Sequence, residues 1–379
     1  MKLRCTICGR EYDRPVQRCE CGEPVEFELF HGKPYIGKTV WERFYDFWPV
    51  EPDPELSLGE GDTPLIRSKL GNELGIKLYL KNETVNPTWS FKDRGTFLAI
   101  SHAVKEGYKA VGTVSTGNMA ASVAAYAAKA GLKAKILVSE EASKEKLKAV
   151  SVYGADVIRV KGDYGRLYFK SLKLGERLGV YFMNSDNPLR VEGYKGISFE
   201  IAEEITPDYV LIPTSSGGLF RGVAKGFIEL FVSGLIDRIP TLVAVQAEGC
   251  SPICRAFKEG KERIERFESP KTIAHAIENP YPPSGNAVLK LFREMGGLCV
   301  TVSDEEIIKA QAELAREGLF VQPSSATGIA ALKKLNLPEG VNVVSILTGS
   351  GLKALSTAPL GKVRECSIEK LRECIENNS

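Results

Sequence analysis

The feature that most constrains the fold is a regular alternation of apolar strand-like runs with helical runs, starting near residue 59. The strand-like runs cover 77–81, 109–114, 134–138, 156–160, 180–183, 209–213, 242–246 and 343–347. The helical runs cover 93–107, 118–131, 143–152, 165–178, 219–233, 251–258, 286–296 and 304–317. Such alternation is typical of parallel sheets covered by helices on both faces. Because 379 residues exceed what one hydrophobic core usually serves, we expect an α/β protein of two or three domains.

The composition argues against two classes of function. A net charge of +2, with both signs interspersed, predicts no nucleic-acid binding surface. The chain has no apolar run of about 18 residues, so we expect no membrane span. The N-terminus lacks the apolar core of a secretion signal. We therefore expect a cytoplasmic protein whose nine cysteines are reduced.

Lys92 is the main candidate for a catalytic residue. It lies between a predicted strand and a predicted helix, just after the turn that Asn86-Pro87 imposes. Ser90 places a hydroxyl near the amine, and Phe91 gives it an apolar wall. A partly desolvated lysine has a lowered pKa and can act as a nucleophile, which suits a Schiff base with pyridoxal phosphate. The alternative is a solvated lysine at a helix start, which the neighbouring residues disfavour.

Two loops that follow predicted strands and open predicted helices are candidate anion sites. They are expected at the carboxyl edge of a parallel sheet, where helix-start amides bind anions. The first loop is Ser115-Thr116-Gly117-Asn118, and Asn118 can also hydrogen-bond a ring hydroxyl of the cofactor. The second is Ser215-Ser216-Gly217-Gly218-Leu219, whose consecutive amides suit a phosphate. The alternatives are a plain asparagine N-cap for the first loop and a tight turn for the second.

Two further loops complete the candidate site. Thr348 follows the last apolar strand, and a hydroxyl from it or from Ser350 can meet a pyridine nitrogen. A hydroxyl partner leaves that nitrogen unprotonated, which suits elimination and replacement chemistry over transamination. The segment 184–193 offers Asn184, Ser185 and Arg190 to a second anion, on the substrate. The alternatives are a strand-ending turn and a capped loop with a surface arginine.

The cysteines fall into two groups. Cys5, Cys8, Cys19 and Cys21 lie close together and can close a four-thiolate zinc site. The N-terminal segment is too short for a core of its own, so a structural zinc ion has a physical purpose there. Four incidental thiols are the alternative, because the second pair is one residue tighter than usual. The remaining cysteines are scattered and are predicted to be packing or surface residues: Cys250, Cys254, Cys299, Cys366 and Cys374.

Together these motifs resemble pyridoxal-phosphate enzymes of the tryptophan synthase β type, and within that family the threonine synthases most closely. The resemblance rests on 86–95, 115–118, 215–219 and 348–353, with support from 59–65, 184–193 and 245–249. It extends from the N-terminus to about Lys353. It implies two doubly wound parallel-sheet domains with an N-terminal cysteine-rich extension like a zinc ribbon. The implied boundaries are 1–30 for the extension, 31–92 with 196–355 for a large cofactor domain, 93–195 for a small mobile substrate domain, and 356–379 for a C-terminal tail.

The resemblance also implies roles for individual residues. Lys92 would hold the cofactor, Asn118 would contact its ring hydroxyl, and Thr348 would face its ring nitrogen. The cofactor phosphate would lie on Ser215, Ser216, Gly217, Gly218 and Leu219. Ser115, Thr116 and Gly117 would bind the substrate carboxylate, and Asn184, Ser185 and Arg190 would hold the phosphate of an O-phospho amino acid. The implied reaction converts O-phosphohomoserine and water to threonine and phosphate. We expect a homodimer, the common assembly of soluble enzymes.

Three positions depart from the threonine synthase pattern. Trp89 stands where the family usually has glycine, Met119 stands where it has threonine, and 215–219 resembles the loop of serine or threonine dehydratases. A bulky Trp89 favours a shorter substrate such as O-phosphoserine, which cysteate synthases combine with sulfite. Three alternatives therefore stay open: a cysteate synthase, a dehydratase, and a catalytically silent scaffold that binds a partner through the cysteine knuckle.

Overall fold

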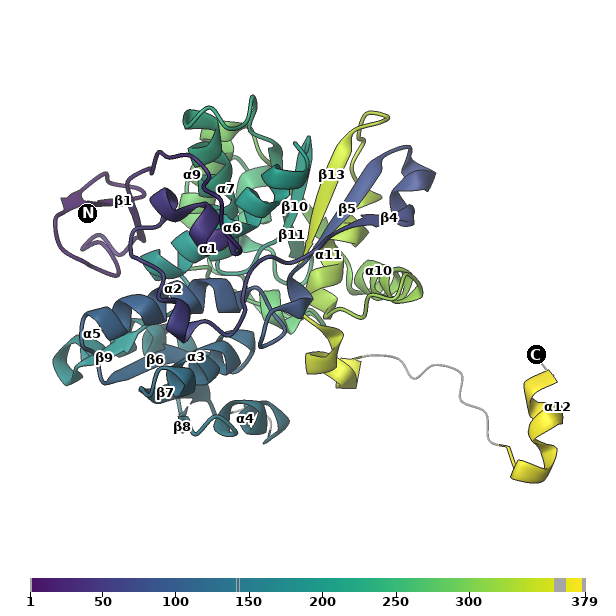
Figure 1. Ribbon diagram of the computed structural model, residues 1–379, viewed down its shortest axis with the longest axis horizontal. Coiled ribbons are helices and arrows are strands. Elements are labelled where there is room, and N and C mark those ends of the chain that lie inside the picture. Colours follow the sequence, from purple (N-terminus) through teal and green to yellow (C-terminus); the bar gives the residue numbers. More distant parts are fainter. Residues whose placement is uncertain (1, 141, 143, 358–365, 377–379) are drawn as a thin grey trace.

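The computed structural model describes residues 2–140, 142, 144–357 and 366–376 (Figure 1). Within this part of the chain the strands form three sheets, of which the two larger ones are mainly parallel and carry helices. The α/β class expected from the alternation is therefore confirmed. No helix of the described residues is long and apolar enough to cross a bilayer.

The larger sheet has six strands in the order β12-β11-β10-β13-β5-β4. Their bounds are β4 Leu65–Ser68, β5 Lys77–Asn82, β10 Tyr209–Pro213, β11 Thr241–Ala247, β12 Leu298–Val302 and β13 Asn342–Leu347. The central strands are rich in valine, leucine and isoleucine and are buried on both faces, as in parallel sheets between helix layers. The edge strand β4 pairs antiparallel with β5, so this sheet is not parallel throughout.

The smaller sheet has four parallel strands in the order β8-β7-β6-β9. Their bounds are β6 Ala110–Val114, β7 Lys133–Ser139, β8 Asp156–Val160 and β9 Val180–Phe182. The helices between them are α3 Asn118–Lys129, α4 Lys144–Ser151 and α5 Tyr164–Leu178, with α2 Lys92–Lys105 leading into β6. These elements form one half of the molecule, and β10, β11 and β13 lie in the other (Figure 1).

The other helices of the larger half are α7 Gly218–Val232, α8 Pro252–Lys258, α9 Gly285–Met295, α10 Asp304–Arg316 and α11 Pro323–Leu332, and α6 Pro188–Glu204 precedes them. The sequence predicted neither α6 nor α11, nor the strands β4 and β12. Nearly every residue of α6 and α11 is buried, so neither helix has the polar stripe by which a surface helix is recognised. The expected boundary at residue 195 falls inside α6, and the domain boundaries remain a prediction.

The N-terminal extension forms a small antiparallel sheet of β1 Leu3–Cys5, β2 Glu11–Tyr12 and β3 Val25–Phe27. It lies beside α6, α7 and α9 (Figure 1). Buried lysines on those helices bind the extension and the segment after it. Lys225 Nζ donates to the Phe27 carbonyl at 2.6 Å, and Lys195 Nζ donates to the Phe47 carbonyl at 2.6 Å. Glu192 and Glu229 balance both ammonium groups, so the extension is held to the main body by charges that are buried and paired.

The remaining described elements are short. They are α1 Val40–Arg43, α12 Leu371–Glu376 and the 3-10 helices Tyr45–Phe47, Pro54–Leu56, Lys69–Leu74, Glu83–Val85, His275–Ile277, Gly351–Thr357 and Ile368–Lys370. Of the expected tail 356–379, residues 358–365 and 377–379 lie outside the described residues. Helix α12 lies apart from the two sheets in Figure 1.

The scattered cysteines differ from expectation. Cys254 of α8 and Cys299 of β12 form a disulfide, and Cys366 and Cys374 form another. The expectation that every cysteine is reduced is therefore wrong for these four, whereas Cys250 is free and buried. Cys254 and Cys299 are 45 residues apart in the chain and meet because β12 pairs with β11 beside α8, a pairing that the sequence did not reveal.

Candidate active site

Lys92 is the first residue of α2, and the residues that follow it anchor this helix start in the interior. Asp93 accepts hydrogen bonds from the Thr88 amide and hydroxyl, both at 2.6 Å. Gly95 allows α2 to pack closely on α6, because a Cβ there would lie 2.7 Å from the Arg190 carbonyl oxygen. The backbone that carries Lys92 is thus fixed from both sides.

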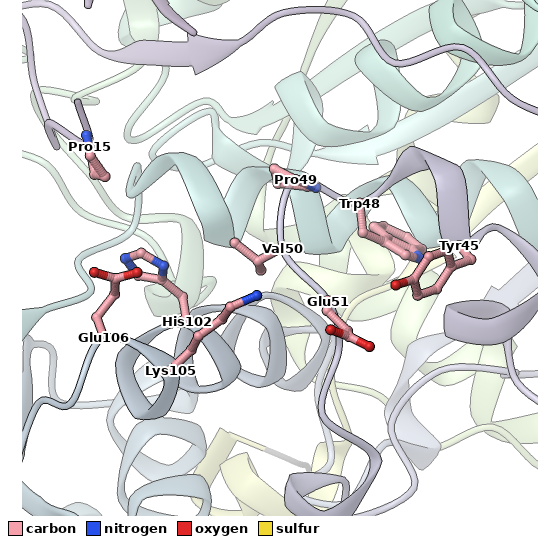
Figure 2. A pocket seen from close by; sticks show the side chains of 9 residues that line it. All are labelled: Pro15, Tyr45, Trp48, Pro49, Val50, Glu51, His102, Lys105 and Glu106. Carbon is pink, nitrogen blue, oxygen red and sulfur yellow. The ribbon is translucent and has the colours of Figure 1, made fainter. Parts of the chain in front are cut away.

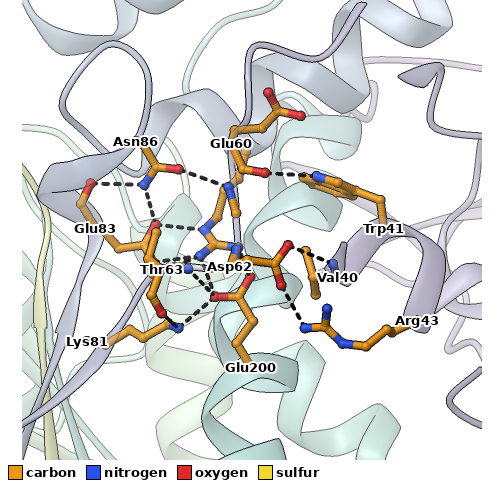
Figure 3. Close-up of polar contacts among 12 residues, drawn as sticks. Val40, Trp41, Arg43, Glu60, Asp62, Thr63, Lys81, Glu83, Asn86 and Glu200 are labelled. Carbon is orange, nitrogen blue, oxygen red and sulfur yellow. Dashed lines mark hydrogen bonds and ion pairs between the residues drawn. The ribbon is translucent and has the colours of Figure 1, made fainter. Parts of the chain in front are cut away.

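Arg94 is the centre of a buried ion-pair network. Its guanidinium donates to both oxygens of Glu83, at 2.7 and 2.8 Å, and to both oxygens of Glu200, at 2.5 and 2.7 Å. Lys81 adds a second cation, with its Nζ 2.6 Å from Glu200 (Figure 3). Burial alone would raise the pKa of Glu200, but the charges of Arg94 and Lys81 lower it to about 2. The network joins α2 to the end of β5 and to α6.

The run 59–65, one of the segments that support the family resemblance, also contributes contacts to this region (Figure 3). The Gly61 amide donates to Asn86 at 3.1 Å, and the Asp62 amide donates to Glu200 at 2.8 Å. Glu60 accepts a hydrogen bond from the Tyr126 hydroxyl on α3 at 2.5 Å, and burial raises its pKa to about 7. The run therefore links the turn before Lys92 to helices of both halves.

The Lys92 side chain is partly buried, and its amine bonds no other residue that the structure describes. Its Nζ lies 4.4 Å from the ring centroid of Phe91 and 5.9 Å from that of Tyr194, and it donates no hydrogen bond to any residue that the structure describes. Burial, with a smaller contribution from the charge of Arg190, lowers the pKa of Lys92 to about 7. The amine is therefore a nucleophile and base near neutral pH.

Helix α7 presents a bare N-terminus at the loop 215–219. Its first residue is Gly218, and no side chain caps it. Gly217 has φ +89°, and a Cβ there would lie 2.9 Å from Val288. A Cβ on Gly218 would lie 2.6 Å from the carbonyl oxygen of Ser185. Only glycines fit this turn, and they leave the helix-start amides open to an anion, as a phosphate cradle requires.

Thr348 lies directly beside the lysine segment. Its carbonyl accepts from the Phe91 amide at 3.1 Å, and Ser90 forms a β-bridge with Gly349. Its hydroxyl lies 2.9 Å from that of Ser325 on α11, which also bonds the backbone of Gly349. Sequence reasoning missed Ser325, because α11 was not predicted as a helix.

Asn118 is not an N-cap, so that alternative is wrong. The N-cap of α3 is Gly117, and no side chain caps the helix. The Asn118 side chain instead pairs with that of Gln322, donating at 2.9 Å and accepting at 3.4 Å. A Cβ on Gly349 would lie 2.8 Å from the Gln322 Oε1, so the loops at 115–118 and 348–350 meet here. Gln322 was also missed, because it is the N-cap residue of α11, a helix that the sequence did not predict.

Ser115 and Thr116 are partly exposed, and Gly117 is exposed, so this loop is open to a ligand. Asn184 is different. Its Oδ1 accepts from the Val114 amide at 2.9 Å, and its Nδ2 donates to the Ser171 hydroxyl at 3.1 Å, so its side chain is used inside the protein. Ser185 is partly buried, with its carbonyl against the loop 215–219.

Arg190 is fully buried beneath the start of α2, so the alternative of a surface arginine is wrong. It donates to the Thr96 hydroxyl at 2.7 Å, to the Tyr194 hydroxyl at 3.1 Å and to the Lys92 carbonyl at 3.3 Å. Its Nε is buried without a partner among the described residues. The guanidinium is thus a cation held next to Lys92 with one donor unused.

These residues fit pyridoxal phosphate. The unpaired Lys92 amine, the bare start of α7 and the buried Ser90 hydroxyl, which bonds no other described residue, are groups that a ligand would satisfy. The four N-terminal cysteines fit a metal, because their Sγ atoms all lie within 4.8 Å of one another. The pairs Cys5–Cys21 and Cys8–Cys19 are each 3.6 Å apart, close to the edge of a tetrahedron with zinc–sulfur bonds of about 2.3 Å.

A separate hollow lies outside this region. It is a cavity of about 210 Å³ between the segment 45–51 and the end of α2. Figure 2 shows the side chains that line it. It is lined by Pro15, Tyr45, Trp48, Pro49, Val50, Glu51, His102, Lys105 and Glu106. None of these residues is a predicted site residue, and the charged ones carry both signs, so this cavity does not compete with the Lys92 region as the catalytic site.

Comparisons with known proteins agree with this geometry. Residues 56–349 match the family model described as pyridoxal-phosphate dependent enzyme. A threonine synthase of Methanocaldococcus jannaschii is 41% identical over 378 residues, covering 93% of each chain. A threonine synthase of Methanosarcina acetivorans is 35% identical over 400 residues, covering 98% of each chain. The crystal structure of a T.th. threonine deaminase superposes with a TM-score of 0.64 at 28% identity, covering 79% of this chain and 94% of that one.

Proposed function

This chain belongs to the pyridoxal-phosphate-dependent enzymes, and from that premise we propose that it is a threonine synthase. It would convert O-phosphohomoserine and water to threonine and phosphate. The observation that carries the proposal is the position of the free Lys92 amine among loops that offer two separate anion sites. One is the bare start of α7, and the other combines the open loop 115–117 with the segment 184–190.

The cofactor would be held mainly by residues of the larger half, with Asn118 of α3 added from the smaller half. Pyridoxal phosphate, once bound, supplies an aldehyde for an amine and a ring that withdraws electrons from the substrate α-carbon. The amides of 215–219 would hold its phosphate, and the Thr348 hydroxyl, fixed by Ser325, would face the ring nitrogen. Asn118 would bond the ring hydroxyl, which requires it to exchange its contact with Gln322.

The substrate would be held by the loop 115–117 and by the segment 184–190, which runs into α6. Ser115, Thr116 and Gly117 would bind its carboxylate. Ser185 and Arg190 would bind its phosphate, with the unused Nε of Arg190 as the donor that is available without breaking a bond. Asn184 would act by fixing Ser185 and the end of β6, since its own side chain is already bonded.

Lys92 would carry the protons of the reaction. Its amine removes protons from Cα and Cβ, and the bond between Cγ and the phosphate oxygen breaks, the electron pair leaving with the phosphate. One of the two protons goes to Cγ, which becomes the methyl group of threonine, and the other leaves with the phosphate as hydrogen phosphate. Water then adds its hydroxyl group to Cβ and its remaining proton to Cα. A pKa of about 7 lets one amine both accept and return protons near neutral pH.

The test is a three-substrate assay on the purified holoenzyme. We expect phosphate and threonine from O-phosphohomoserine. Phosphate release from O-phosphoserine only when sulfite is present would replace the proposal by a cysteate synthase. Ammonia from unphosphorylated threonine would replace it by a dehydratase, which the sequence of the 215–219 loop favours as the second candidate.

A borohydride experiment tests the enzyme class independently. We expect the wild-type chain with added cofactor to show a visible absorbance band and to retain the cofactor on Lys92 after reduction. Lys92→Ala should retain none. Retention by Lys92→Ala equal to the wild type would remove Lys92 from its proposed role, and no band in the wild type would favour the silent scaffold.

We further propose that the enzyme is a cytoplasmic homodimer with a zinc ion on Cys5, Cys8, Cys19 and Cys21. The geometry of the four sulfur atoms supports the metal. Light scattering on the purified protein tests the dimer, and its metal content tests the zinc site, with one ion per chain as the expected result.

A further inference from the structure

The cysteine knuckle docks on α7, which begins at the proposed cofactor-phosphate loop, and on α9, whose N-cap residue Ser284 bonds that loop. Arg221 of α7 donates to the Val25 carbonyl at 3.2 Å. From α9, Asn286 donates to Glu23 at 2.7 Å, and Lys290 donates to the Thr6 carbonyl at 2.9 Å. The knuckle is therefore attached to the helices that position the loop 215–219.

Arg18 extends from the knuckle toward the active site. It precedes Cys19, and its Nε donates to the Gly22 carbonyl at 3.0 Å, so its side chain is held by the knuckle itself. Its guanidinium forms an ion pair with Asp186, donates to the Pro283 carbonyl at 3.2 Å, and lies 5.3 Å from the Phe169 ring centroid. Only 10% of the Arg18 side chain and 3% of the Asp186 side chain is exposed, so the pair is shielded from water.

The two targets of Arg18 each adjoin one of the proposed anion sites. Asp186 directly follows Ser185, whose carbonyl packs against Gly218. Pro283 directly precedes Ser284, whose amide donates to the Ser216 carbonyl at 3.0 Å and whose hydroxyl accepts from Arg221 at 3.2 Å. One side chain therefore connects the substrate segment 184–187 to the support of the cofactor-phosphate loop.

We infer that Arg18 is a positioning residue that fixes the substrate segment 184–187 against the loop 215–219, and that the metal knuckle serves the active site by holding Arg18. The inference rests on the proposed function for the identity of the substrate. Its physical basis does not depend on that identity, because any phosphate bound between these loops needs their separation to be fixed. A displacement of about 1 Å in such a segment can cost about 100-fold in rate.

The main experiment compares Arg18→Ala with Arg10→Ala in the holoenzyme. Arg10 is the matched control, since it also lies in the knuckle but pairs with Glu20 at the surface. For Arg18→Ala we expect kcat/KM for O-phosphohomoserine to fall roughly 10- to 100-fold, with a rise in KM as the larger part of the loss and cofactor affinity within about 3-fold of wild type. Arg10→Ala should leave all three unchanged. An unchanged KM, or a loss of cofactor affinity as large as the loss of substrate affinity, would overturn the inference.

A measurement without turnover separates this inference from the proposed function. The thermal shift of the holoenzyme is recorded against inorganic phosphate, and its half-saturation is expected to rise in Arg18→Ala but not in Arg10→Ala. If the wild type does not convert O-phosphohomoserine, the proposed function fails, but this comparison still decides the role of Arg18. Equal half-saturation in both variants would refute that role.

Two more conservative variants test the same contact with less risk of misfolding. Asp186→Asn keeps the shape of the partner and removes its charge, so it should raise the phosphate half-saturation in the same direction as Arg18→Ala but by less. Arg18→Lys keeps the charge but loses the fork geometry that reaches both Asp186 and Pro283, so it should fall between wild type and Arg18→Ala. Wild-type values for both would contradict the inference.

The inference that the metal knuckle acts by holding Arg18 is tested by comparing metal-free and zinc-loaded protein. We expect removal of the metal to raise the phosphate half-saturation of the wild type toward that of Arg18→Ala, and to have little further effect on Arg18→Ala itself, because both changes act through one side chain. Equal and additive effects in the two proteins would show that the knuckle does not act through Arg18.

Discussion

The two sides of the site differ in how their residues are held. On the cofactor side, the Lys92 amine and the amides at the start of α7 bond no other described residue, and the Thr348 hydroxyl is held in place by Ser325. On the substrate side, the side chains of Asn184 and Arg190 are buried and bonded to the protein. The cofactor side is therefore ready for its ligand, whereas the substrate side offers an open loop, a serine and one unused guanidinium donor.

This difference shows that the type of a residue does not by itself establish that the residue contacts a ligand. Asn184 and Arg190 have the right chemistry for a phosphate, but much of their hydrogen-bonding capacity is used to join β6, α2 and α6. A residue on the substrate side thus acts partly through its neighbours, which is also how Arg18 is proposed to act.

The largest expected effect comes from the ion-pair network behind Lys92. Arg94→Met would leave Glu83 and Glu200 buried with too little positive charge, so we expect a loss of about 3 to 5 kcal/mol in the free energy of unfolding. Denaturant titration measures it. The control is Arg238→Met, which breaks a largely exposed pair with Asp208 and should cost less than about 1 kcal/mol. Equal costs would show that the network does not anchor the cofactor side.

The second prediction compares the effect on cofactor affinity of replacing one glycine in each of the two loops. Gly217→Ala should weaken pyridoxal phosphate binding by about 10-fold or more, because φ +89° and Val288 at 2.9 Å both oppose a Cβ. Gly117→Ala should leave cofactor affinity within about 2-fold, since no atom lies within 4 Å of its Cβ position. Absorbance titration of the apoenzyme measures both. A larger loss for Gly117→Ala would reverse the assignment of the two loops.

The third prediction concerns the pH dependence of cofactor uptake. The neutral amine of Lys92 is the reactive form, so the rate at which the apoenzyme takes up pyridoxal phosphate should rise with pH through a midpoint of about 7, not near the ordinary lysine value of 10.5. Folding lowers this pKa, so between pH 7 and 10.5 Lys92 carries a proton in the unfolded chain but not in the folded apoenzyme. The burial of Lys92 therefore costs less folding free energy as pH rises through that window, and the apoenzyme becomes more stable.

Arg190 variants sharpen that prediction. Arg190→Met removes the positive charge near Lys92, so the pH midpoint of cofactor uptake should move upward. It should stay below 10.5, because burial, the larger cause of the lowered pKa, remains. Arg190→Lys keeps a charge and should move it less. Stopped-flow absorbance across pH measures the midpoints, and identical values for the two variants would show that Arg190 does not influence Lys92.

The smallest expected effect is at Trp89. This residue has φ +62°, which explains why glycine is usual there, and its side chain is 51% exposed rather than filling the pocket. Trp89→Gly should be more stable than Trp89→Ala, by about 1 kcal/mol, because both remove the indole and only glycine relieves the left-handed strain. Thermal unfolding measures the difference. Equal stability would mean that this turn carries no strain.

The features of the fold and of the site that depend on local sequence pattern were predictable from the sequence. The α/β class, most helices and strands, and the loops around Lys92, 215–219 and 348 follow from apolar runs and glycine turns that neighbours in the chain impose on one another. The match to a pyridoxal-phosphate family model over residues 56–349 supports the same interpretation.

The contacts of individual side chains depend on how distant segments pack, and they became visible in the structure alone. Helices α6 and α11 are hidden from periodicity because they are buried on nearly all sides, so the positions of Arg190 and Ser325 were not predictable. The contacts of Asn118 with Gln322 and of Arg18 with Asp186 join residues 204 and 168 positions apart. Local propensity carries no information about such distances, since they are set by how the two sheets and the knuckle pack together.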